Sequence, residues 1–75
     1  MPSAEDFVAA FLRANERDAY CAGCLASRTG LGVRETEEAM VRLGREAEFI
    51  IERTRCARCG VTDDAIRVLR RARGV

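Results

Sequence analysis

CAGC at residues 21–24 and CARC at residues 56–59 are the stretches that decide how this chain folds. Each contains two cysteines separated by two residues. Paired C-x-x-C knuckles supply the four soft ligands of a tetrahedral metal site, because the two-residue gap lets both thiolates of a pair face one ion. The spacing therefore predicts one structural zinc ion. Its expected ligands are Cys21, Cys24, Cys56 and Cys59.

Three other uses of the cysteines are weighed against zinc. Two disulfides suit a secreted protein, whereas the acidic and polar start of this chain predicts no signal peptide and a reducing, cytoplasmic location. A single C-x-x-C serves thioredoxin-like chemistry, but that motif belongs on a βαβ unit and needs no second pair. Iron is also compatible with four thiolates, so the metal stays open between zinc and iron, with zinc favoured.

Length and composition explain why such a chain needs a metal. A chain of 75 residues is expected to form one domain, over residues 1–75. The core of so small a domain is only marginally stable unless a metal, a disulfide or a partner chain stabilises it. The 48% hydrophobic and 33% charged residues indicate a folded soluble domain and not a disordered chain. No apolar run approaches the roughly 20 residues that span a bilayer, so no membrane partner is expected.

Two helices are predicted around the first cysteine pair. The first covers residues 3–15, with Ser3 as its cap and an apolar stripe that includes Phe7 and Phe11. The second begins after Asp18 and runs to about residue 27, which places the first cysteine pair on one helical face. Gly30 is the expected left-handed terminator of this helix.

A third helix and a strand precede the second cysteine pair. The helix is predicted over about residues 33–47, with Val33, Met40, Leu43 and Ala47 on its buried face. Residues 49–55 are β-branched and then alternate, which predicts a strand. Residues 62–72 are ambiguous, because Thr62-Asp63-Asp64 is typical of a helix start while the following residues partly alternate.

The two knuckles also carry a resemblance to a known group of proteins. YCAGCLA at residues 20–26 opens a helix, and a strand leads into RCARCG at residues 55–60. Over about residues 5–70 the chain resembles small bacterial zinc-binding winged helix-turn-helix proteins, which are largely uncharacterised. The resemblance implies a mainly helical α+β fold, with three helices followed by a β-hairpin and stapled by one zinc. Asp63 and Asp64 depart from the pattern, since acidic residues are unusual in a wing strand.

The winged architecture makes duplex DNA the first expected partner, although this rests on analogy. Formal net charge is +1, but residues 49–75 hold seven arginines against three acidic residues, while residues 1–48 hold six against nine. Phosphate contacts are therefore expected mainly from the C-terminal part. The candidate nucleic-acid-binding residues are Arg34, Arg42, Arg45, Arg53, Arg55, Arg58, Arg67, Arg70 and Arg71.

Two alternatives to a DNA-binding regulator compete with it. The near-neutral charge and the three glutamates that begin the third helix favour a zinc-stapled protein-interaction module. A thiol redox or zinc-sensing switch is a further hypothesis. An enzyme is not expected, because the chain has no histidine and four cysteines would close the coordination sphere of the metal. The oligomeric state is not predicted.

Overall fold

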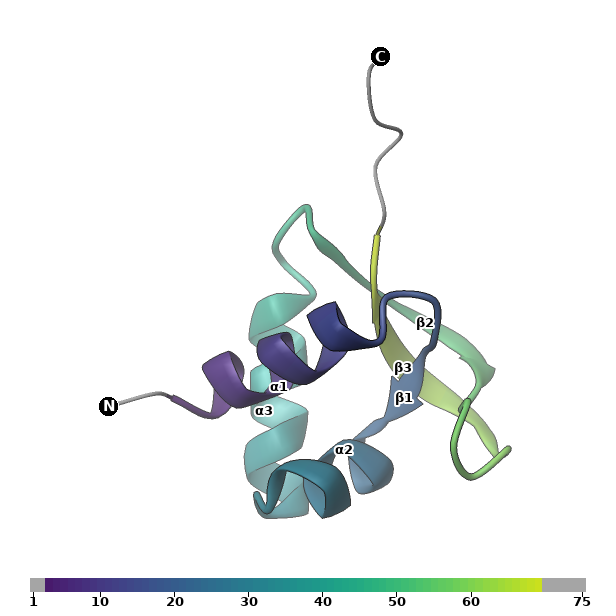
Figure 1. Cartoon of the computed structure of the whole chain (residues 1–75), viewed down its shortest axis with the longest axis horizontal. Helices are drawn as coiled ribbons and strands as arrows, with labels where there is room; N and C mark the ends of the chain where they lie inside the picture. The colour runs from purple at the N-terminus through teal and green to yellow at the C-terminus, as the bar shows by residue number, and fades with distance from the viewer. Residues whose placement is uncertain (1–2, 70–75) are drawn as a thin grey trace.

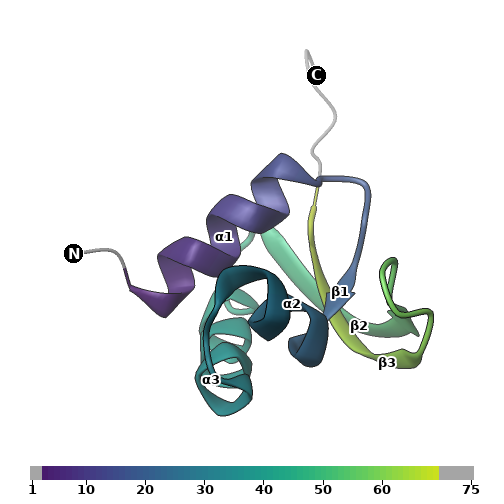
Figure 2. The ribbon, with the colours of Figure 1, turned by 60° about the horizontal axis from the view of Figure 1, so that its bottom comes forward.

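The computed structural model describes residues 3–69, which form three helices and one three-stranded antiparallel sheet (Figure 1). The elements in chain order are α1 (Ala4–Ala14), β1 (Tyr20–Cys21), α2 (Ala22–Thr29), α3 (Val33–Leu43), β2 (Phe49–Arg55) and β3 (Thr62–Val68). The strand order is β1-β3-β2, so the last strand is central. Figure 2 shows the helices gathered on one side and the β2–β3 hairpin on the other. The small α+β architecture predicted from the sequence is confirmed.

Helix α1 begins as predicted. The Ser3 side chain accepts a hydrogen bond from the Asp6 amide, and the Asp6 carboxylate accepts one from the Ser3 amide at 3.0 Å. This reciprocal capping satisfies two amide donors that the first turn leaves without helical partners. The buried stripe is centred on Val8 and Leu12, which leaves Phe7 at its edge and 46% exposed. The prediction of Phe7 as a core residue was therefore wrong.

Helix α2 starts later than predicted, because a short strand precedes it. Tyr20 and Cys21 pair with Ile66 and Ala65 of β3, which holds their backbone extended. The helix therefore begins at Ala22 and not after Asp18. Its end is as predicted, since Gly30 adopts φ +81°, a left-handed conformation that favours glycine.

Helix α3 ends at Leu43, earlier than the predicted end near Ala47. The Gly44 amide donates to the Met40 carbonyl at 2.8 Å, and a turn leads from there into β2. The buried face consists of Thr36, Ala39, Met40 and Leu43. Val33 was wrongly predicted on that face and is 52% exposed. None of the helices in the described part of the chain is both long and apolar enough to cross a bilayer.

Residues 62–68 of the ambiguous segment form strand β3. Strand β3 pairs with β2 along its whole length, from Phe49 opposite Val68 to Arg55 opposite Thr62. Pairing with β2 prevails over the local helix-start signal, because it buries Ile66 and Val68 with Phe49 against the helices. Residues 70–72 of the ambiguous segment lie outside the described residues.

Candidate metal centre

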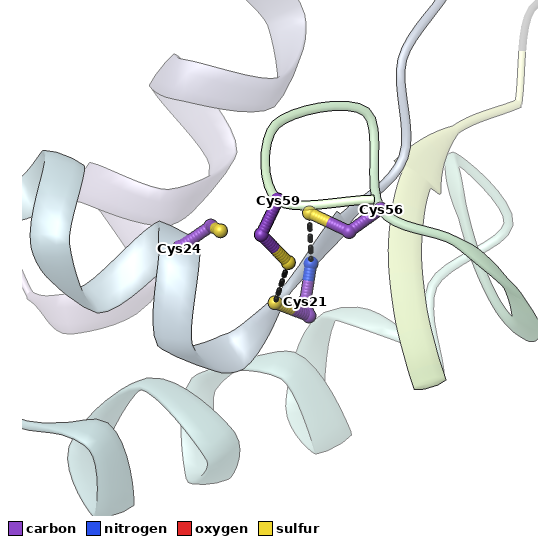
Figure 3. A group of neighbouring side chains, drawn as sticks. All are labelled: Cys21, Cys24, Cys56 and Cys59. Atoms are coloured by element: carbon purple, nitrogen blue, oxygen red, sulfur yellow. Dashed lines mark hydrogen bonds between the residues drawn. The ribbon is translucent and has the colours of Figure 1, made fainter. Parts of the chain in front are cut away.

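The fold brings the four cysteines together from three places in the chain (Figure 3). Cys21 ends β1 and caps α2, Cys24 lies in the first turn of α2, and Cys56 and Cys59 belong to the loop between β2 and β3. Their sulfur atoms all lie within 4.8 Å of one another. The chain thus presents four ligand atoms of one chemical kind that can hold a metal ion.

The loop that carries the second pair, residues 56–60, is fixed to its surroundings by backbone hydrogen bonds. The Ala57 amide donates to the Ala19 carbonyl at 2.8 Å, just before β1. The Cys56 amide donates to the Val61 carbonyl at 2.9 Å, and the Gly60 amide to the Cys56 carbonyl at 3.0 Å. Gly60 has φ +78°, so the turn uses the glycine that follows the second cysteine. The position of the loop therefore does not depend on the sulfur atoms alone.

The sulfur geometry fits a tetrahedral ion. A zinc–sulfur bond of about 2.3 Å implies sulfur–sulfur distances of about 3.8 Å around a tetrahedron. The Cys21 and Cys59 sulfur atoms lie 3.8 Å apart. All four cysteines are free thiols, and a disulfide would require about 2.05 Å between two sulfur atoms. The arrangement is thus suited to a metal bound by four thiolates.

Backbone amides lower the pKa of the Cys56 thiol. Burial raises the pKa of Cys56, but hydrogen bonds from the backbone of Cys59, Cys21 and Arg58 outweigh burial and lower it to about 6. The Cys21 amide lies 3.5 Å from this sulfur. These donors occupy the positions from which a second shell stabilises thiolate ligands. The site is therefore prepared for negative charge before a metal arrives.

The thiols of Cys21 and Cys24 have raised pKa values. Burial and thiol neighbours raise the pKa of Cys24 to about 12. Burial also raises the pKa of Cys21, against a backbone hydrogen bond from Cys24 that lowers it. Cys56 is 1% exposed and Cys59 is exposed, so the cluster has a buried side and a solvent side. Metal binding must remove protons from Cys21 and Cys24.

Tyr20 does not lie on the surface beside the cysteines. Its ring packs edge to face on Phe11 with 5.0 Å between the ring centres, and its hydroxyl donates to Asp18 at 3.3 Å. Only 8% of Tyr20 is exposed. Strand β1 thus ties the metal centre directly to the core under α1.

Three of the arginines predicted to bind nucleic acid are engaged with groups of the chain itself. Arg42 pairs with Glu5 at 3.1 Å and Arg67 with Glu52 at 3.0 Å, while the Arg55 guanidinium donates to the Gly60 carbonyl at 3.0 Å. Within residues 3–69, five of the predicted arginines make no ion pair: Arg34, Arg45, Arg53, Arg55 and Arg58. Arg70 and Arg71 lie outside the described residues.

Two arginines that the sequence analysis did not single out lie near the metal loop. Arg28 lines a hollow with Arg58 and Ala57, and Arg17 lines a neighbouring hollow with Arg55 and Ala57. We refer to Arg17, Arg28, Arg55 and Arg58 as the arginine face. These residues are far apart in the sequence, so no local pattern could have grouped them. Ala57 belongs to both hollows, which places the metal loop between the two arginine pairs.

Comparison with protein-family models, with curated proteins and with solved structures finds no match to this chain. The cysteine cluster and the surfaces around it are therefore interpreted from their own geometry and chemistry.

Proposed function

We propose that the chain is a winged-helix module stapled by one structural zinc ion, and that it recognises another protein. The order α1-β1-α2-α3-β2-β3 and the strand order β1-β3-β2 support a winged helix. In this interpretation α2 and α3 form the helix-turn-helix and the β2–β3 hairpin is the wing. Four thiolates without a histidine favour zinc in a closed, structural site.

The proposed role is not enzymatic. Four cysteine ligands complete the tetrahedral coordination of a zinc ion, whereas a catalytic zinc keeps a position open for water or substrate. The ion would instead join the start of α2 to the wing loop. The activity of the module then resides in its surfaces.

The observation that carries the proposal is the chemistry of the face formed by α3 and the wing. A helix that enters the major groove presents donors and positive charge near its N-terminus. In α3 the exposed residues around the N-terminus include Val33 and Glu37, and Asp63 and Asp64, which follow Thr62 at the start of β3, line the same hollow. Carboxylates repel phosphate, and exposed valines favour contact with apolar side chains of a protein.

A photo-crosslinking residue at position 41, which is exposed on α3, tests the proposal in cells that encode the chain. We expect a crosslink to a distinct protein from position 41 and none from position 35, which is exposed, lines a different hollow and lies about 120° away around the same helix. Labelled duplex DNA of mixed sequence provides the second arm. Binding in the micromolar range that falls by at least a thousandfold between about 50 and 200 mM salt would overturn the proposal.

Duplex DNA remains a second candidate partner because of the arginine face. Arg58 and Arg17 make no ion pair within residues 3–69, and Arg28 contacts only the Phe11 ring through its guanidinium at 5.9 Å from the ring centre. Guanidinium groups bind phosphate in bidentate fashion. This candidate places DNA against the metal loop and not against α3.

The same DNA titration separates the two surfaces. If DNA binds through the arginine face, Arg28→Ala and Arg58→Ala each weaken binding and reduce its salt dependence, while Arg34→Ala on α3 has no effect. Loss of binding with Arg34→Ala alone would instead place DNA on the recognition helix. No binding by the parent chain at low salt removes this second candidate.

A further inference from the structure

A cleft of about 590 Å³ lies between α3 and the β2–β3 hairpin, beside the cysteines. Its apolar lining includes Met40 and Ile51 together with Val33, Val41 and Val61. The three valines are 52%, 54% and 57% exposed. The described residues contain five exposed large apolar side chains, and three of them line this cleft. The exposed apolar surface is therefore concentrated at one place.

The rim of the cleft carries negative charge. Glu37 of α3 and Asp63 and Asp64 of β3 line it, and no arginine does so among residues 3–69. The nearest arginine by register is Arg53, which lies opposite Asp64 on the paired strand. The Asp63 carboxylate accepts a hydrogen bond from the Asp64 amide at 2.7 Å. Within the described residues, neither aspartate is part of an ion pair.

We propose that this cleft binds a short protein segment in which apolar side chains alternate with arginine or lysine. The inference rests on the proposed function, because it names the chemistry of the protein partner. Apolar side chains of the segment fill the floor between α3 and the hairpin, where their burial removes apolar surface from water. Its basic side chains pair with Glu37, Asp63 and Asp64 at the rim, which gives orientation and excludes acidic segments.

The cysteines connect this cleft to the metal centre. Cys21, which immediately precedes α2, and Cys59 of the metal loop also line the cleft. The cluster thus fixes the distance between the two walls, since Cys21 precedes the helical hairpin and Cys59 belongs to the β-hairpin. Preorganised walls reduce the conformational cost of binding a flexible segment.

Two labelled peptides of equal length serve as probes of the zinc-loaded full chain, one alternating leucine with arginine and one alternating leucine with glutamate. We expect the leucine–arginine peptide to bind at least tenfold more tightly in fluorescence anisotropy, which corresponds to 1.4 kcal/mol or more. Equal affinity for the two peptides, or no binding of either, would overturn the proposal.

Variants of exposed residues assign the binding to the cleft. Val33→Ser with Val41→Ser should weaken the leucine–arginine peptide at least tenfold without changing charge. Glu37→Lys with Asp64→Lys should reverse the preference between the peptides. Glu35→Lys makes the same charge reversal as Glu37→Lys alone, but about 160° away around α3 in a different hollow, and should leave the cleft unaffected. The proposal is contradicted if the first two variants leave the peptide affinities unchanged, or if the third variant changes these affinities as much as the first two do.

Sedimentation of the free chain tests the competing occupant, a second copy. A dimer that Val41→Ser dissociates would mean that the cleft binds the chain itself, and the proposal would be overturned. The two proposals also fail separately. A crosslinked partner at position 41 with no preference for basic peptides refutes the partner chemistry alone, whereas absence of any crosslinked protein refutes the proposed function.

Discussion

Cys56 and Cys24 differ in the surroundings of their sulfur atoms and therefore in their pKa values. Cys56 is buried and receives amide donors, which lower its pKa to about 6, whereas burial and neighbouring thiols raise the pKa of Cys24 to about 12. A thiol and a thiolate can therefore coexist in the metal-free cluster, because one charge is well solvated by amides and further charges are not. A divalent metal supplies the positive charge that allows the remaining thiols to ionise.

This asymmetry predicts a steep dependence of zinc affinity on pH. Because Cys21 and Cys24 have raised pKa values, both bind protons at neutral pH and lose them when zinc binds. Release of these two protons by itself makes the apparent association constant rise about a hundredfold per pH unit, and any further proton released makes the dependence steeper. Competition with a chromophoric chelator between about pH 6 and 8, corrected for protonation of the chelator, measures the slope. Cys24→Ser should lower the slope by one, and a parent slope below one would contradict the prediction.

Thr36 is the one buried polar residue of the core in the described chain. Its hydroxyl donates to the Gly32 carbonyl at 2.8 Å, in the turn that joins α2 to α3. The Thr36 amide also donates to this carbonyl at 2.9 Å, so the acceptor keeps one partner if the hydroxyl is removed. The hydroxyl therefore contributes a single hydrogen bond to the turn between the two helices.

We expect Thr36→Val to lower the free energy of unfolding by about 1 kcal/mol, because the shape of the side chain is retained and one hydrogen bond is lost. Urea denaturation of the zinc-saturated protein measures the change. Thr29→Val at the end of α2, whose hydroxyl donates to the Leu25 carbonyl at 2.6 Å at a half-buried position, serves as comparison. A change below 0.3 kcal/mol at position 36, or a stabilisation, would contradict this assignment.

At the scale of elements, the contact between α3 and β2 is set by a glycine. A Cβ atom at Gly44 would lie 2.7 Å from Cδ1 and 3.2 Å from Cγ1 of Ile51, and 3.2 Å from the Met40 carbonyl oxygen. A Cβ atom at position 44 therefore requires the Ile51 side chain to move or the end of α3 and β2 to separate. The backbone of Gly44 is itself helical, so its role here is close packing and not an unusual conformation.

This close approach predicts that Gly44→Ala is destabilising although alanine favours helices. Overpacking typically costs 1–3 kcal/mol, against a gain of at most about 1 kcal/mol from reduced chain entropy. A net loss of about 1 kcal/mol in thermal or urea unfolding is expected. Ile51→Val removes the Cδ1 atom, so Gly44→Ala should cost clearly less in that background. Equal costs in both backgrounds would show that Ile51 is not the obstacle.

At the scale of the whole molecule, the cysteine cluster links parts that local interactions do not hold together. The first pair precedes and opens α2, and the second lies in the loop between the two long strands. Strand β1 contributes only two residues to the sheet, so the pairing between the helical part and the hairpin is short. An ion bound by the cluster would add four strong bonds at this junction. It would thereby compensate for the small core of a 75-residue chain.

Removal of the metal should therefore unfold the protein cooperatively. A strong chelator at 37 °C is expected to abolish the helical circular dichroism signal and the thermal transition, because metal binding and folding are one equilibrium in small stapled domains. Addition of zinc should restore both, whereas magnesium, which prefers oxygen ligands, should restore neither. A native spectrum that persists after verified loss of the metal would refute this prediction.

Features encoded by neighbouring residues were predictable from the sequence. The Ser3 cap, the left-handed Gly30, strand β2 and the approximate positions of the three helices depend on contacts within a few residues. The four cysteines were grouped by their ligand chemistry, since two C-x-x-C pairs suit one tetrahedral ion whatever chain connects them.

The remaining features depend on tertiary structure alone. Non-local contacts either override the local sequence pattern or bring together residues that no local pattern links. Strand β3 replaces a plausible helix start because β2 offers a partner for every residue of it. The two residues of β1 are too few to show a period, and they are extended only because β3 lies beside them. The arginine face and the acidic apolar cleft are assembled from segments far apart in the chain. The sequence by itself therefore determined which four cysteines cluster and most of the elements, while packing determined which surfaces they form.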